Sequence, residues 1–139
     1  MTSWIGRAFA LIPRVASTAA VMVLAVLLTG LSAQASEEWL TDYDEALAES
    51  TRSGKPVLTL FTGSDWCPHC RTLEERVFST SEFESWSEEH VVLLMIDLPE
   101  SGISPAVRSE RSRICLKYGV RTFPSVLVLD SFGEKITEE

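Results

Sequence analysis

The chain has 139 residues, room for one domain, and carries 20 acidic against 12 basic residues, a formal net charge of −8. Nucleic-acid binding requires phosphates to be neutralised by lysine and arginine, so an acidic chain without a basic stripe argues against that class of function. We therefore expect one acidic domain and no nucleic-acid partner.

The N-terminal segment has the layout of a secretory signal peptide. Arg7 and Arg14 are the only charged residues before Glu37, and they precede an apolar run over residues 15–31. The small-x-small triplet Ala33-Gln34-Ala35 follows, which is the pattern of a cleavage site. This layout predicts that the segment directs export of the rest of the chain.

Cleavage after this triplet would leave a single mature domain. We predict a signal peptide over residues 1–35 and a periplasmic or secreted domain over residues 36–139. The alternative is an uncleaved N-terminal anchor, because about 17 apolar residues come just within the range of a membrane span. All 20 acidic residues and ten of the 12 basic ones lie in the mature domain.

The mature domain opens with a predicted helix followed by a buried strand. Over residues 39–53, apolar side chains recur at helical spacing, at Trp39, Leu40, Tyr43, Ala46 and Leu47. Gly54 is a typical residue for the end of a helix, and Pro56 cannot continue one. The apolar, β-prone run over residues 57–62 then predicts a strand.

The segment Trp66-Cys67-Pro68-His69-Cys70 comes after this strand, and a helix is predicted over residues 67–78. Leu73, Val77 and Phe78 are spaced to face one side of that helix. A cysteine at a helix start lies beside unpaired backbone N–H groups and the positive end of the helix dipole, and both favour the thiolate. This placement predicts thiol–disulfide exchange.

The remaining elements alternate helices with apolar strands. In chain order we expect a short helix beginning at 79–82, a strand over 91–96, a loop over 97–105, a helix over 106–118 closed by Gly119, a strand over 125–129, a turn over 130–133 and an edge strand over 134–137. Early β-α-β alternation closed by a hairpin predicts an α/β sheet with mixed strand directions. Strands that are apolar at every position need helices on both faces.

Metal binding and haem attachment are the other chemistries that a Cys-x-x-Cys pair suggests. Zinc needs four donors, and the other candidates, His69, His90 and Cys115, lie at no ligand-like spacing. Covalent haem attachment needs a histidine directly after the second cysteine, where Arg71 stands. We therefore expect a redox-active disulfide, no metal and no cofactor.

Two segments make the chain resemble the thioredoxin superfamily. The first, Phe61-Thr62-Gly63-Ser64-Asp65-Trp66-Cys67, is similar to the approach to the motif in exported thioredoxin-like proteins. The second, Lys117-Tyr118-Gly119-Val120-Arg121-Thr122-Phe123-Pro124, is similar to the family segment that leads into a cis-proline. The resemblance covers residues 39–137 and implies a three-layer α/β/α fold with a mixed sheet. The long C-terminal helix usual in the family has no counterpart before Glu139.

The resemblance also implies roles for three residues of the motif. Cys67 would be the nucleophile and Cys70 the resolving cysteine. His69 would stabilise the Cys67 thiolate, and Pro68-His69 is similar to the motif of the oxidising DsbA-type members. The simpler interpretation of His69 is an exposed histidine at a helix start with no role.

Four residues around the motif would contact substrate, namely Trp66, Pro68, Phe123 and Pro124. The resemblance implies that Pro124 is in the cis form and faces Cys67, beside a β-like edge for substrate peptides. The alternatives are that Trp66 is one more core aromatic residue and that Pro68 only suits the first turn of a helix.

The helix predicted over residues 106–118 carries the third cysteine. Cys115 falls on its inward face, where a free cysteine packs as a small hydrophobic residue. Arg108, Arg111 and Arg113 are expected to form a solvated face of the same helix.

Together these observations predict an exported thiol–disulfide oxidoreductase that exchanges disulfides with protein substrates through Cys67 and Cys70. Its expected partners are protein thiols or disulfides and a membrane redox donor or acceptor. Direct membrane attachment is expected only if the N-terminal segment is retained. The direction of electron flow stays open. The alternative is a non-catalytic thioredoxin-fold binding module with an inert disulfide.

Overall fold

The computed structural model describes residues 39–136, and the predictions for residues 1–38 and 137–139 lie outside this range. Its elements, in chain order, are α2 (Tyr43–Ser53), β1 (Val57–Thr62), α3 (Pro68–Leu73), η1 (Glu74–Phe78), α4 (Ser81–His90), β2 (Val92–Asp97), α5 (Pro105–Tyr118) and β3 (Ser125–Leu129). None of the helices in this range is both long and apolar enough to cross a membrane.

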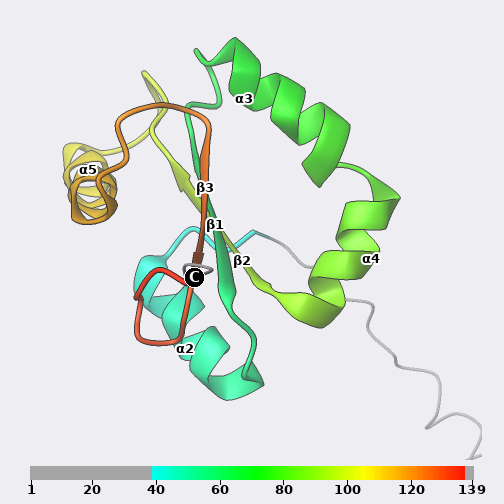
Figure 1. Cartoon of the computed structure of the whole chain (residues 1–139). Coiled ribbons are helices and arrows are strands. Elements are labelled where there is room, and N and C mark those ends of the chain that lie inside the picture. The colour runs from blue at the N-terminus through cyan, green and yellow to red at the C-terminus, as the bar shows by residue number, and fades with distance from the viewer. Residues whose placement is uncertain (1–38, 137–139) are drawn as a thin grey trace, which may run out of the picture. The chain divides into compact units, whose positions relative to one another are not determined.

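The central strand β1 organises a three-stranded sheet of order β2-β1-β3 (Figure 1). It pairs in parallel with β2, where Thr62 lies opposite Asp97 at the carboxyl ends, and antiparallel with β3. All six residues of β1 are buried. A strand between two partners and two helical layers must be apolar on both faces, which explains the unbroken run. The predicted α/β fold with mixed strand directions is confirmed.

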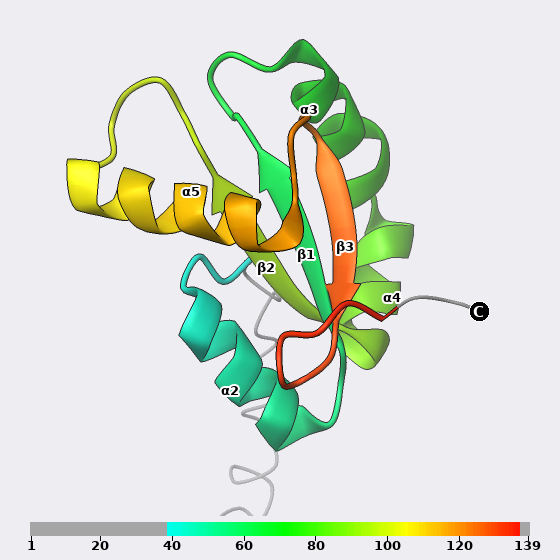
Figure 2. The ribbon, with the colours of Figure 1, turned by 60° about the vertical axis from the view of Figure 1, so that its left-hand side comes forward.

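Helices cover both faces of this sheet (Figure 2). On one face, α2 and α5 pack on alternate strand residues in a cluster that includes Ala46, Val57, Phe61, Leu94 and Tyr118. On the other face, α3, η1 and α4 pack on the intervening residues in a cluster that includes Leu58, Leu60, Phe78 and Leu93. Successive side chains of a strand point to opposite faces, so β1 and β2 each contribute to both cores. The three-layer arrangement is therefore confirmed.

The second of these faces is only partly covered within residues 39–136. Val126 of β3 lies opposite Leu60 in the register, on the same face, and its side chain is exposed. No helix follows β3 in the described range. The β3 side of this face therefore contacts solvent in the described domain.

Three helix ends lie at capping residues that the sequence predicts, whereas the start of the first helix does not. α2 ends at Gly54 and α5 at Gly119, and the hydroxyl of Thr80 caps α4. The predicted start of the first helix at residue 39 is wrong. Asp42 is the N-cap of α2, because its carboxylate accepts a hydrogen bond of 2.9 Å from the N–H of Glu45.

The residues ahead of this cap extend the sheet. Leu40 forms a parallel bridge with Leu94 of β2, and Trp39 packs against Phe78 and Phe83 on the other face. The spacing of Trp39 and Leu40 also fits a helix. Their apolar pattern alone therefore could not distinguish a helix from an extended segment that pairs with β2.

A π-helical turn interrupts the helix that follows the cysteines. The prediction of one continuous helix over 67–78 is wrong here, because α3 ends at Leu73 and the N–H of Ser79 bonds to the carbonyl of Glu74 at 2.8 Å. The wider turn lets Leu73 and Phe78, five residues apart, pack in the same apolar cluster. Val77, expected to face inward, is exposed for the same reason.

Within the described part of the edge strand predicted over residues 134–137, Lys135 forms an antiparallel bridge with Leu129. The N–H of Ile136 donates a hydrogen bond of 2.9 Å to the carbonyl of Val128. Residue 137 lies outside the described range.

Two tyrosines connect the turn after β3 to α2 and α5 through hydrogen bonds. The hydroxyls of Tyr43 and Tyr118 lie 2.6 Å apart, and Tyr118 donates a hydrogen bond of 2.8 Å to the carbonyl of Gly133. The ammonium of Lys117 donates to the Tyr43 hydroxyl at 2.8 Å. Burial, reinforced by the hydrogen bond with Tyr43, raises the pKa of Tyr118, so its hydroxyl stays protonated as a donor.

Replacing Gly133 with alanine should destabilise the domain more than replacing Gly102. Both glycines have positive φ, 74° and 85°, so both substitutions strain the backbone. A Cβ at Gly102 meets nothing within 4 Å, whereas one at Gly133 would overlap the Tyr43 hydroxyl. We expect urea unfolding to show losses of roughly 1 kcal/mol for Gly102→Ala and roughly 2–4 kcal/mol for Gly133→Ala. Equal losses would show that the tyrosine contact does not hold this turn.

Candidate active site at the start of helix α3

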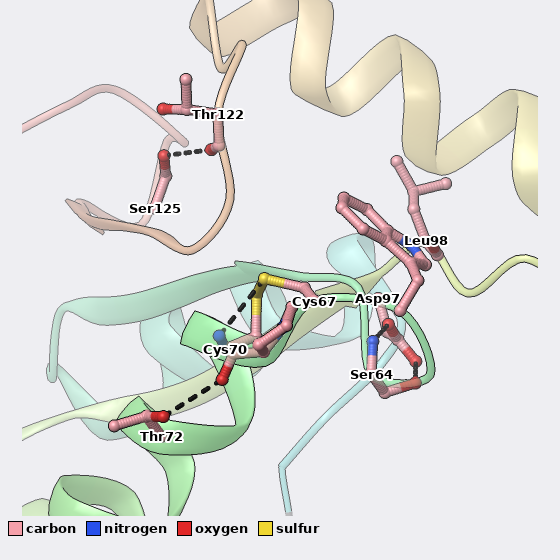
Figure 3. Close-up of a disulfide and its surroundings, with 10 residues drawn as sticks. Ser64, Cys67, Cys70, Thr72, Asp97, Leu98, Thr122 and Ser125 are labelled. Carbon is pink, nitrogen blue, oxygen red and sulfur yellow. Dashed lines mark hydrogen bonds between the residues drawn. A yellow bond between two sulfur atoms is a disulfide. The ribbon is translucent and has the colours of Figure 1, made fainter.

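Cys67 and Cys70 form a disulfide just beyond the carboxyl end of the central strand (Figure 3). Their Cα atoms lie 5.3 Å apart. Cys67 is the N-cap residue of α3, and Pro68 occupies the first turn. The sulfur of Cys67 accepts a hydrogen bond of 3.2 Å from the backbone N–H of Cys70. The two cysteines that the sequence singles out therefore meet at the start of a helix.

The disulfide lies directly beneath the surface. The exposed fraction is 3% for Cys67 and 5% for Cys70, and neither residue belongs to the apolar clusters that fill the two cores. The neighbouring Trp66, Pro68 and His69 are exposed, Trp66 to 42%. The disulfide is therefore buried, while the residues on both sides of Cys67 are exposed.

The backbone at this position distinguishes the two cysteines. The first N–H groups of a helix have no partner within the helix, and that of Cys70 points at the Cys67 sulfur. The positive end of the helix dipole lies on the same side, and both features favour negative charge on Cys67 in the reduced protein. Cys70 lies inside the helix and supplies the donor.

His69 lies on the exposed side of the first turn of α3. Within residues 39–136 its ring forms no hydrogen bond or ion pair, and the hydrogen bond to the Cys67 sulfur comes from the backbone instead. Stabilisation of the thiolate by His69 stays a prediction that concerns the reduced protein.

Trp66 joins the cysteine loop to two other segments. Its indole N–H donates a hydrogen bond of 2.9 Å to the carbonyl of Leu98, and its ring packs edge-on against Phe123 with centroids 5.7 Å apart. The Phe123–Pro124 peptide bond is cis. Because β1 and β3 are antiparallel, the end of one meets the start of the other. The segment before β3, which runs from Thr122 to the first strand residue Ser125 in Figure 3, is therefore brought to the cysteine end of the sheet.

Two aspartates bind the loop over residues 63–66 to the loop that follows β2. Asp97 accepts hydrogen bonds from the N–H of Ser64 at 2.9 Å and from its hydroxyl at 2.6 Å. Asp65 lies on the cysteine loop itself, and its carboxylate accepts hydrogen bonds from the loop after β2. The N–H of Glu100 lies 2.9 and 3.1 Å from its two oxygens, and the N–H of Ser101 lies 3.4 Å from one of them. The sequence analysis missed both aspartates, because their partners lie 33 to 36 residues away and no local spacing reveals them.

Two arginines of α5 hold the same loop from the other side. Arg111 donates to the carbonyl of Asp97 at 2.7 Å, and Arg108 donates to two further carbonyls of the loop at 2.6 and 3.1 Å. The expectation that these arginines are simply solvated is wrong for both, although Arg113 is exposed. A guanidinium group has several donors and can satisfy the carbonyls of a loop that no strand pairs with.

Cys115 is a free cysteine buried against the first core, in the cluster that contains Phe61 and Tyr118. Burial raises the pKa of its thiol. Both features favour the predicted packing role. Among residues 39–136, no group of three or more histidine, cysteine or carboxylate side chains is arranged to hold a metal ion.

A family model described as thioredoxin-like matches residues 38–131. The chain belongs to this family. It is 30% identical over 105 residues to the disulfide bond reductase DsbH of Chlamydia pneumoniae, over 75% of this chain and 63% of that protein. The solved structure of a DsbH oxidoreductase is similar with a TM-score of 0.67 and 30% identity, over 74% of this chain and 72% of that one.

A second curated relative is the thioredoxin-related protein DsbJ of Chlamydia pneumoniae. It is 28% identical over 118 residues, which cover 77% of this chain and 34% of that protein. This thioredoxin-like chain thus spans less than two thirds of the length of DsbH and about a third of that of DsbJ. The similarity is confined to a shared domain.

Cys115 should not react in the folded, oxidised protein. Its raised pKa and its burial leave little accessible thiolate at about pH 8. We expect a thiol-reactive chromogenic disulfide to detect no thiol in the native protein and one per chain after denaturation. A Cys115→Ser variant should lose that signal. Equal reaction rates in the native and denatured protein would contradict the packing role.

Proposed function

We propose that this protein is a thiol–disulfide oxidoreductase that acts on protein substrates through Cys67 and Cys70. The observation that carries the proposal is the disulfide at the start of α3, with the Cys67 sulfur bonded to the N–H of Cys70. A bridge between residues three positions apart constrains the unfolded chain little, so stabilisation explains it poorly. Membership of the thioredoxin-like family and the similarity to DsbH support the same activity.

In this proposal Cys67 is the nucleophile and Cys70 the resolving cysteine. The Cys67 thiolate attacks one sulfur of a substrate disulfide, a mixed disulfide forms, and the other substrate sulfur leaves as a thiolate that takes up a proton. Cys70 then loses its proton and attacks the Cys67 sulfur, so the Cys67–Cys70 bond forms as the mixed disulfide breaks. Two electrons pass to the substrate, and a dithiol donor must reduce the pair again.

We propose Trp66, Pro68, Phe123 and Pro124 as the substrate contacts. Pro68 is exposed beside the disulfide, and the Trp66–Phe123 contact brings the segment before β3 to the same end of the sheet. An extended peptide can lie along such a segment and present its sulfur to Cys67. The low exposure of the sulfurs favours a flexible protein segment as substrate.

Reduction of the substrate is the direction that we propose. The relative DsbH is named a disulfide bond reductase. A membrane protein that supplies dithiol electrons is the proposed donor.

The proposed site of action is outside the cytosol. The charged start, the apolar run over 15–31 and the triplet Ala33-Gln34-Ala35 support removal of residues 1–35 as a signal peptide. Retention of this segment would instead anchor the domain to the membrane from which its electrons come.

The second candidate is a binding module with an inert disulfide. The exposed fraction of 3% at Cys67 favours it, because a reactive sulfur must be reached by its partner. Reactivity of the pair separates the two candidates.

A Cys70→Ala variant should trap mixed disulfides. Without Cys70 the first exchange still occurs, but nothing displaces the bound substrate. With insulin as the substrate, we expect a covalent adduct of the reduced variant on non-reducing gels, and at least a roughly tenfold loss of insulin reduction relative to the wild type. The matched Cys67→Ala variant should form no adduct. Failure of the wild type to reduce insulin, together with no adduct, would support the binding module.

His69→Gln should make the pair more reducing. If the imidazole stabilises the Cys67 thiolate, its removal raises the pKa of Cys67 and lowers the reduction potential, by about 30 mV for each 1.4 kcal/mol lost. We expect equilibration with glutathione to give a wild-type potential of about −200 to −270 mV, the range of glutaredoxins and thioredoxin. A wild-type value near −120 mV would indicate an oxidase, and an unchanged variant would remove His69 from the mechanism.

A further inference from the structure

We infer that Asp97 and Asp65 are positioning residues that set the reactivity of Cys67 by clamping the loop before it from two directions. The inference rests on the proposed function, because it concerns the same disulfide. Neither aspartate belongs to the Cys-x-x-Cys motif, and each acts on Cys67 only through the backbone.

The first half of the clamp is Asp97. Its backbone is held in the sheet opposite Thr62, so its carboxylate projects from a fixed point at the end of β2. Each of its two oxygens accepts one hydrogen bond from Ser64, three residues before Cys67 (Figure 3). Hydrogen bonds to an ionised acceptor are stronger than those between neutral groups.

The second half of the clamp runs in the opposite direction. Asp65 lies on the cysteine loop, and its carboxylate accepts from the N–H groups of Glu100 and Ser101. The indole of Trp66 adds the hydrogen bond to Leu98. Three consecutive residues, 64 to 66, are therefore each bonded to the segment over 97–101. A displacement of the cysteine loop away from this segment breaks these hydrogen bonds.

The clamp is fixed at both of its ends. Arg108 and Arg111 tie the segment over 97–101 to α5 through its carbonyls. At the other end, the N–H of Cys67 bonds to the carbonyl of Gly63 at 2.9 Å and closes the turn. A Cβ at Gly63 would overlap the Trp66 ring, so this turn has no room for a larger residue.

This loop decides whether the Cys67 sulfur meets its donor. As the N-cap, Cys67 has extended backbone angles, and its sulfur lies 3.2 Å from the N–H of Cys70. The N–H must point at the sulfur for this bond to form, so a change in the direction in which the Cys67 side chain leaves the loop weakens it. Small misplacements of reacting groups are known to slow catalysis strongly.

Positioning and direct electrostatics predict opposite changes in the pKa of Cys67. A carboxylate near a thiolate disfavours it, so removal of the Asp97 charge alone lowers the pKa of the thiol. Loss of positioning removes the N–H donor from the sulfur and raises that pKa. Ser64→Ala loosens the clamp without changing any charge, so it isolates the positioning effect.

The test uses the full mature chain with the variants Asp97→Asn, Asp65→Asn and Ser64→Ala, and the double variant Ser64→Ala/Asp97→Asn. The readouts are insulin reduction and the pH profile of Cys67 alkylation by iodoacetamide. We expect each single variant to slow insulin reduction about tenfold and to move the alkylation profile to higher pH. The double variant should be no slower than Asp97→Asn alone, because both changes break the same contact.

The matched control is Asp130→Asn. Asp130 also caps a turn with its carboxylate, which accepts from the N–H groups of Phe132 at 2.8 Å and Glu134 at 2.9 Å, but it lies after β3, at the opposite end of the sheet. We expect it to lower stability to urea without moving the alkylation profile. Variants that lose stability but keep the wild-type profile, or an Asp97→Asn profile that moves to lower pH, would overturn the inference. A wild type that reduces no insulin would overturn the proposed function itself, which is a separate outcome.

Discussion

The place of Cys67 in space depends on the burial of strand β1. This strand pairs on both sides and is covered on both faces, so its carboxyl end is a firmly held point of the domain. The chain leaves it at Thr62, turns once, and starts a helix at Pro68. The cysteine at the junction thus takes its position from hydrophobic packing and its chemistry from the unpaired N–H groups of a helix start.

The features that could be predicted from the sequence are those decided by local composition. The apolar run over residues 57–62 is long enough and β-prone enough to specify a buried strand, and Gly119 ends a helix wherever it can adopt positive φ. Cys67 and Cys70 belong to the same category, because a separation of three residues at a helix start brings two sulfurs within bonding distance whatever the rest of the chain does.

The features that could not be predicted depend on contacts between distant segments. Leu40 lies in an extended segment because it pairs with Leu94 at the edge of β2. The sequence of residues 39–47 gives no indication of this pairing. The π turn exists because Leu73 and Phe78 share one apolar cluster, a requirement set by the sheet. Asp97 resembles any acidic residue at the end of a strand until the fold brings Ser64 to it. The site residues that the sequence hides are therefore those that position the reacting sulfur.

The contacts that hold the loop before Cys67 differ in strength between its β2 side and its β3 side. On the β2 side, five donors form hydrogen bonds between residues 64–66 and the segment over 97–101, and four of these donors reach carboxylates. A hydrogen bond to a charged group contributes about 1.5–3 kcal/mol. On the β3 side, the contact between Trp66 and Phe123 is a single edge-on ring pair, worth about 0.5–1.5 kcal/mol beyond its buried area. The contact on the β3 side is therefore the weaker of the two. The β3 side also carries Pro124, in the segment that we assign to the substrate, so a peptide that binds there meets the less firmly held side of the loop.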